Sequence, residues 1–190
     1  AVMEAIMKRA AHPTYGYTAE LADDHQALID FWQRRHGLSL QSEWLTLMPC
    51  VVTGIKLSIL ALTQPGDKVI IQSPVYGPFR MSVEATGRTL ADAPMLRADN
   101  GRYSMDLAAV EAQLKQGARL MVLCSPHNPA SRAWSKDELT ALIELLDKYD
   151  VPLVSDEIHA DFVYAPNTFV PALSLTQKNV MSFCAASKTF

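Results

Sequence analysis

Cysteine is scarce in this chain of 190 residues. The three cysteines, Cys50, Cys124 and Cys184, are odd in number and far apart, and they lack the short paired spacing of a zinc site. Each lies in or beside an apolar run, so we expect reduced, buried thiols in a cytoplasmic protein. The sequence therefore predicts no metal centre.

Long apolar runs and an excess of basic charge are also missing. No apolar run approaches the roughly 18 residues that a membrane-spanning helix needs, and the first nine residues are amphipathic, unlike a signal peptide. Lys and Arg number 17 against 20 Asp and Glu, which gives a net charge of −3 with no basic run. We therefore expect neither a membrane nor a nucleic acid as a partner.

Internal repeats, low-complexity tracts and clear linkers are absent from the sequence as well. The composition, 49% hydrophobic and 19% charged, fits one globular domain with a sizeable core. Both ends look cut, because the chain opens within a helix and closes directly after a strand. We therefore expect a piece of a longer protein.

What is present is an alternation of predicted strands and helices. Short apolar runs predict strands, and 3.6-residue periodicity with capping residues predicts helices. This order is typical of an α/β domain with a mainly parallel sheet flanked by helices. The predicted strands are 44–48, 68–72, 88–93, 120–124, 151–155 and 179–186, and the predicted helices are 2–10, 20–36, 51–62, 79–86, 106–115 and 136–149.

Four of the predicted strands are followed by polar or aromatic residues, namely Tyr76, Asn128, the pair Asp156 and His159, and Lys188. In open α/β sheets, ligands bind outside the carboxyl ends of the strands. The alternative for each residue is structural. Asp156 would cap a turn, His159 would lie on the surface, and Tyr76 would pack within a proline-rich turn.

Two further stretches are candidates for binding. Gly54-Ile55-Lys56 stands near the start of a predicted helix, where backbone N–H groups and the helix dipole favour an anion, although neither a P-loop nor the GxGxxG pattern is present. The turn of residues 14–18 carries Tyr15 and Tyr17 around Gly16. Its aromatic residues either pack locally or reach a site.

Three motifs together resemble a known family. Ser125-Pro126-His127-Asn128-Pro129, Ser155-Asp156-Glu157-Ile158-His159 and Ser187-Lys188-Thr189-Phe190 are similar to motifs of the fold type I enzymes that use pyridoxal 5′-phosphate (PLP), the aspartate-aminotransferase superfamily. Within it they most resemble the MalY/PatB-type cystathionine β-lyases. The resemblance covers the whole chain but only about the middle half of a family member. It implies an incomplete PLP-binding large domain over residues 1–190, without an N-terminal segment and a C-terminal small domain.

The resemblance implies a role for each residue after a strand. Lys188 matches the lysine to which PLP is covalently attached, and Asp156 matches the partner of the pyridinium nitrogen. Asn128 matches the donor to the 3′-oxygen, and His159 stands where aminotransferases often carry a tyrosine that touches the same oxygen. Tyr76 matches the aromatic residue that stacks on the ring.

The phosphate contacts follow the same resemblance, with one departure. Gly54-Ile55-Lys56 aligns with the phosphate cup and would act through backbone N–H groups, and Tyr17 resembles the tyrosine that reaches the neighbour's phosphate across a homodimer. Family members usually carry Ser or Thr three residues before the lysine, where this chain has Ala185. Ser187 is a candidate substitute, and Glu157 is expected to be structural.

The implied activity is β-elimination of L-cystathionine or related L-cysteine thioethers to pyruvate, ammonia and a thiol. An amino-acid aminotransferase with the same cofactor is the alternative. A non-catalytic regulatory or binding module on this fold is a third reading, and an inactive fragment is a fourth. The retained Lys188 and Asp156 argue against the regulatory module.

Overall fold

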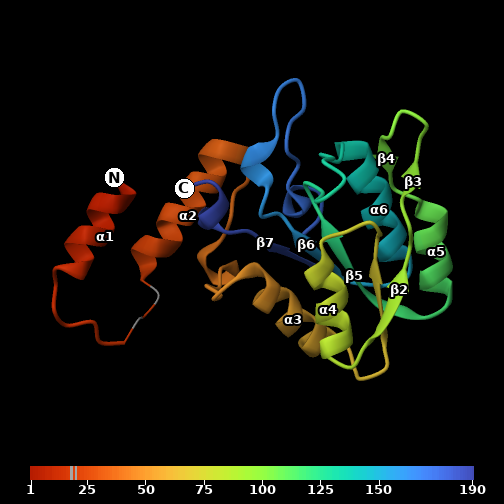
Figure 1. Cartoon of the computed structure of the whole chain (residues 1–190), viewed down its shortest axis with the longest axis horizontal. Coiled ribbons are helices and arrows are strands. Elements are labelled where there is room, and N and C mark those ends of the chain that lie inside the picture. Colours follow the sequence, from red (N-terminus) through yellow and green to blue (C-terminus); the bar gives the residue numbers. More distant parts are fainter. Residues whose placement is uncertain (18, 20) are drawn as a thin grey trace. The chain divides into compact units, whose positions relative to one another are not determined.

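The computed structural model describes residues 1–17, 19 and 21–190 (Figure 1). The chain forms two compact units, residues 48–185 and residues 1–47 with 186–190. Each unit is described by itself. Two residues named above, Thr18 of the aromatic turn and Glu20 at the start of the second predicted helix, lie outside the described residues.

The larger unit is built on a parallel sheet of five strands in the order β2-β1-β5-β6-β7. The predicted α/β class with a mainly parallel sheet is therefore confirmed (Figure 1). The strands are β1 (Lys68–Ile71), β2 (Thr89–Asp92), β5 (Ala118–Cys124), β6 (Leu153–Asp156) and β7 (Val180–Phe183).

Four helices alternate with these strands and cover both faces of the sheet: α3 (Val51–Leu62), α4 (Gly77–Ala85), α5 (Leu107–Lys115) and α6 (Lys136–Lys148). Side chains alternate between faces along each strand. Leu120 and Val122 therefore join the core of α3 and α4, while Met121 and Leu123 join the core of α5 and α6. Both faces of the sheet are buried, which explains its nearly continuous apolar strands.

Local capping chemistry explains the predicted starts of α5 and α6. The side chain of Asp106 accepts a hydrogen bond from the backbone N–H of Ala109 at the start of α5. Ser135 and Glu138 form a capping box at the start of α6. Both helices begin within one residue of their predicted starts.

The larger unit also contains a short antiparallel hairpin that is not among the predicted elements. Strands β3 (Leu96–Arg97) and β4 (Tyr103–Ser104) pair across the turn at Gly101, whose φ of 81° suits glycine. Each strand has only two residues, which is too short to show alternation in the sequence.

The smaller unit contains helices α1 (Val2–Ala10) and α2 (Ala22–His36) and the 3₁₀ turns η1 (Ser42–Trp44) and η4 (Ala186–Lys188). Gly37 ends α2 in the left-handed conformation, as predicted. The strand predicted over 44–48 is wrong, since η1 and an irregular segment occupy this region. Trp44 and Leu47 are exposed there, so the apolar residues bury no face of a sheet.

Two other expectations are corrected. The last strand was predicted to end at residue 186 but ends at Phe183, and after two irregular residues the 3₁₀ turn η4 begins at Ala186. Burial holds for Cys124 but not for Cys50 or Cys184, which are exposed. Among the described helices, none has both the length and the apolar character that crossing a membrane requires.

Candidate active site

Asp156 lies at the carboxyl end of β6 and is buried. Its carboxylate accepts a hydrogen bond from the backbone N–H of Ile158 at 3.1 Å, and its backbone oxygen accepts one from Ser125 at 2.9 Å. The turn-capping alternative therefore describes its geometry correctly. This bond occupies one of the roughly four acceptor positions of a carboxylate.

Asn128 lies in the loop that leaves β5, the strand beside β6. Cys124, the last residue of β5, pairs with Asp156, so both polar residues follow the same edge of the sheet. The backbone N–H of Asn128 donates to the Cys124 Sγ at 3.3 Å, and the bond to Pro129 is cis. The Asn128 side chain is half-buried.

Tyr76 follows β1, the other neighbour of β5, at the residue before α4. Its ring meets Phe79 edge-on with centroids 6.1 Å apart, and 40% of the residue remains exposed. The packing alternative thus explains the contact between Tyr76 and Phe79. The exposed part of the Tyr76 ring stays accessible to a flat ligand.

His159 lies at the start of the 3₁₀ turn η2 (Ala160–Phe162). Its ring meets Phe162 edge-on at 6.3 Å between centroids and is half-buried. His159 therefore lies three residues after Asp156, at the same edge of the sheet.

The expectation for Gly54-Ile55-Lys56 is corrected by the start of α3. The backbone N–H of Gly54 already donates to the Cys50 oxygen at 3.1 Å, and the next two residues lie within the helix, where N–H groups bond to carbonyls four residues earlier. The first N–H groups of a helix lack such partners. At α3 these belong to Val51, Val52 and Thr53, and sequence reasoning missed them.

Gly54 has a packing role instead. A Cβ built there would lie 2.3 Å from a ring carbon of Phe183, at the end of β7. Only glycine lets the strand and helix approach this closely.

Cys50 and Thr53 add polar groups to the start of α3. The Cys50 Sγ lies 3.2 Å from the Thr53 Oγ1. Hydrogen bonding to the Thr53 side chain and backbone lowers the pKa of the exposed Cys50 thiol below its ordinary value. The first turn of α3 therefore favours negative charge.

Glu157 is fully buried beside Asp156. Its Oε1 accepts from the Ser155 hydroxyl at 3.0 Å, the Ala172 N–H at 2.9 Å and the Ser182 hydroxyl at 3.2 Å. Burial raises its pKa to about 7, which these hydrogen bonds partly oppose. The expected structural role is confirmed, because this carboxyl joins β6, β7 and the η3 turn (Ala172–Ser174).

His127 is buried in the loop after β5. Its ring meets Trp134 edge-on at 5.6 Å between centroids, and burial lowers its pKa to about 4. It is therefore neutral near pH 7.

Tyr17, Ser187 and Lys188 belong to the smaller unit and are exposed. Tyr17 is fully exposed, so it does not pack on the described part of the chain. Ala185, the last residue of the larger unit, packs half-buried against the α3 core. The roles of Lys188, Ser187 and Tyr17 stay predictions.

Comparisons with known proteins agree with this arrangement. Cystathionine β-lyase PatB of Bacillus subtilis is 39% identical over 194 residues, covering all of this chain and 50% of the relative. Protein MalY of Escherichia coli is 28% identical and covers 100% and 49%. The chain therefore spans about half the length of the curated relatives it matches.

Solved structures give the same result. A PLP-bound putative aminotransferase from Clostridium difficile matches with a TM-score of 0.96 and 36% identity, covering 100% of this chain and 49% of that one. The PLP-bound C–S lyase from Staphylococcus hominis matches with a TM-score of 0.93 and 28% identity, covering 100% and 49%. The aminotransferase class I and II family matches residues 1–190, and the chain belongs to that family.

Proposed function

We propose that the whole protein is a PLP-dependent carbon–sulfur β-lyase that converts L-cystathionine or related L-cysteine thioethers to pyruvate, ammonia and a thiol. The observation that carries this proposal is the 39% identity to a cystathionine β-lyase over the entire chain. Residues 1–190 would then form part of the PLP-binding large domain.

The donor set of the larger unit suits PLP. The first turn of α3, with its N–H groups and the Thr53 hydroxyl, suits a phosphate dianion. Asp156 provides a buried carboxylate for a protonated ring nitrogen, and Tyr76 provides an exposed aromatic face. Asn128 provides an amide donor for the 3′-oxygen. When bound, PLP supplies an electron sink for negative charge that develops at the substrate Cα.

Asp156 would hold a proton on the ring nitrogen, because a buried carboxylate strongly favours a nearby positive charge. This preference maintains the electron-withdrawing form of the ring. Asn128 and His159 would fix the ring in its plane through the 3′-oxygen. Ser187 would replace the phosphate hydroxyl that is missing at Ala185.

Lys188 would hold the cofactor, and its amine would act as the base that takes the substrate Cα proton. The Cβ–S bond then breaks, and the sulfur leaves with the electron pair and gains a proton. Water and the three-carbon remainder give pyruvate and ammonia.

An aminotransferase is the second candidate, because a solved relative with 36% identity carries that name. Lys188 would then hold the proton that it takes from the substrate Cα and pass it on, instead of supporting loss of the sulfur group. Pyruvate release from L-cystathionine without an added keto acid distinguishes the lyase from the aminotransferase.

We also propose a cytoplasmic homodimer in which Tyr17 reaches the neighbouring site. Tyr17 is completely exposed, so its ring is accessible to a second subunit.

The first test is an absorbance spectrum of the whole protein with PLP, before and after borohydride reduction. The expected result is a band near ~420 nm that Lys188→Ala lacks and that borohydride abolishes, while it leaves the cofactor covalently attached to the unchanged protein. Absence of the band in the whole protein contradicts PLP binding, and retention of the attached cofactor in Lys188→Ala contradicts the role of Lys188.

A further inference from the structure

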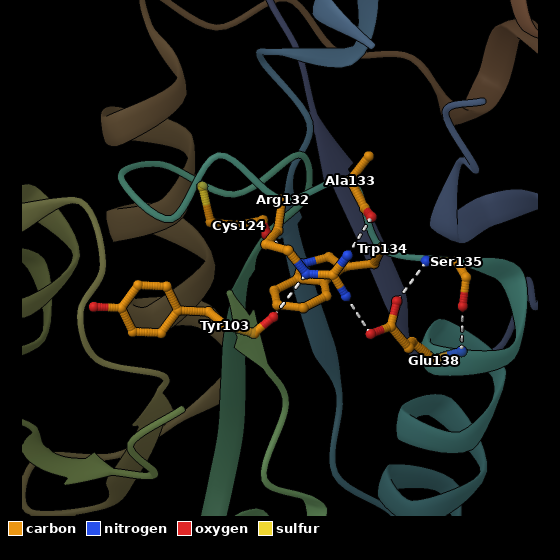
Figure 2. A network of polar contacts seen from close by, with 7 residues as sticks. All are labelled: Tyr103, Cys124, Arg132, Ala133, Trp134, Ser135 and Glu138. Atoms are coloured by element: carbon orange, nitrogen blue, oxygen red, sulfur yellow. Dashed lines mark hydrogen bonds and ion pairs between the residues drawn. The ribbon is translucent and has the colours of Figure 1, made fainter. Parts of the chain in front are cut away.

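Arg132 is the centre of a polar network in the loop that carries Asn128 (Figure 2). Its Nε donates to the Tyr103 backbone oxygen at 2.8 Å, and its Nη2 forms an ion pair with Glu138. A weaker bond joins Nη1 to the Ala133 oxygen at 3.4 Å. The guanidinium lies over the Trp134 ring, 4.8 Å from the centroid. One side chain therefore contacts the β4 hairpin strand, the loop and α6.

Burial makes these contacts stronger than an ordinary surface pair. The Arg132 side chain is only 12% exposed, against 30% for Glu138. The other oxygen of Glu138 accepts the Ser135 N–H at 2.8 Å, as part of the α6 capping box. The ion pair thus joins Arg132 to the first turn of α6, which the capping box already holds in place.

The stretch that leads into Asn128 is held at two places. The His127 N–H donates to the Arg132 backbone oxygen at 2.7 Å. The Asn128 N–H donates to the Cys124 Sγ, and the Trp134 Nε1 donates to the Cys124 backbone oxygen at 2.9 Å. Arg132 and Trp134, which stack on each other, therefore hold the backbone on the N-terminal side of Asn128.

We propose that Arg132 is a positioning residue for Asn128. This inference rests on the proposed function, in which the Asn128 amide donates to the 3′-oxygen of PLP. The planar fork of arginine is required, because one guanidinium must donate to the hairpin and to α6 while it stacks on Trp134. Lysine would keep the charge and lose the fork.

The test uses the pH midpoint of the ~420 nm band of the whole protein with PLP. A donor to the 3′-oxygen withdraws charge from it, so the oxygen holds the nearby imine proton less tightly. Asn128→Ala is expected to raise the proton affinity of the imine about tenfold. Arg132→Gln is expected to raise it about threefold. Arg132→Lys should resemble Arg132→Gln.

The double variant Asn128→Ala/Arg132→Gln decides between an indirect and an independent effect. If Arg132 acts through Asn128, the double variant has the same midpoint as Asn128→Ala alone. Arg119→Gln is the matched control, since Arg119 is exposed near the opposite end of β5. Its midpoint should equal that of the unchanged protein.

The outcomes separate the two proposals. Absence of the band in the unchanged protein, or no shift in Asn128→Ala, overturns the proposed role of the cofactor site. A shift in Asn128→Ala with none in Arg132→Gln overturns the positioning role, and so does a further shift in the double variant. If Arg132→Gln does not fold, Glu138→Gln weakens the same ion pair and is expected to shift the midpoint about twofold.

Discussion

The two loops that follow β5 and β6 bring polar residues to the same edge of the sheet, but they are held in different ways. The loop after β5 is fixed by a largely buried guanidinium whose partner, Glu138, keeps contact with water. The turn after β6 is fixed by Glu157, a fully buried carboxyl whose burial raises its pKa. The loop after β5 therefore depends on the planar geometry of one guanidinium. The turn after β6 depends on all the hydrogen bonds that one buried carboxyl oxygen accepts.

The most disruptive change should be Glu157→Leu. It leaves the Ala172 N–H, the buried Ser155 hydroxyl and the half-buried Ser182 hydroxyl without their acceptor, which we expect to lower the free energy of unfolding by about 4 kcal/mol. Glu157→Gln keeps an acceptor in place and should cost less than half as much. Urea unfolding measures both, and equal losses would mean that the hydrogen bonds at Oε1 contribute little.

A pH series examines the same carboxyl. Its pKa in the folded state is about 7, above the ordinary 4.5, so its contribution is complete below about pH 4.5 and is lost as pH rises through 7. The difference in unfolding free energy between the unchanged protein and Glu157→Gln should therefore change by on the order of 3 kcal/mol from pH 4.5 to pH 8.

Because His127 also makes the free energy of unfolding depend on pH, the effect of Glu157 must be measured as a difference between the unchanged protein and Glu157→Gln. Its pKa is lowered to about 4, so its contribution is present above pH 6.5 and is lost as pH falls toward 4. This trend opposes that of Glu157 in a single curve and cancels in the difference between variants. A difference that is constant over pH would contradict the raised pKa of Glu157.

The smallest effect concerns the loop after β5. Ser131, which is exposed, has a φ of 51°, a conformation that costs a non-glycine residue roughly 1 kcal/mol. Ser131→Gly removes this strain but also gives the unfolded chain more freedom, which offsets part of the gain. The net result should be a free energy of unfolding higher by about 0.5 kcal/mol. Ser104→Gly in β4, where the backbone is extended, should lower it. Thermal unfolding measures both variants. If Ser131→Gly lowers the stability as Ser104→Gly does, the backbone at Ser131 is not strained.

Much of the fold could be predicted because it depends on local patterns. Buried parallel strands carry continuous apolar runs, and α5 and α6 begin at side chains that cap their own backbones. The predicted strand at 44–48 failed because apolar residues alone do not supply a partner strand, and Trp44 is exposed.

The candidate site was less predictable where it depends on contacts between distant residues. Asp156 and Asn128 could be placed at the edge of the sheet because one ends an apolar strand and the other lies in the loop that leaves the neighbouring strand. The Arg132 network was missed, since Tyr103 lies 29 residues away in a hairpin that the sequence did not reveal. The N–H groups at the start of α3 were missed although the helix was predicted over its observed bounds, because the glycine at 54 was taken as the place where the backbone approaches an anion.

The close approach of Gly54 to Phe183 has a consequence for how this chain can change over time. With the phenylalanine ring present, position 54 accepts no side chain without displacement of β7. With a smaller residue at 183, alanine at 54 would fit and would favour the helix. The same substitution is thus harmful in one background and beneficial in the other, so the two positions are expected to covary among relatives, and glycine at 54 should persist wherever the ring does.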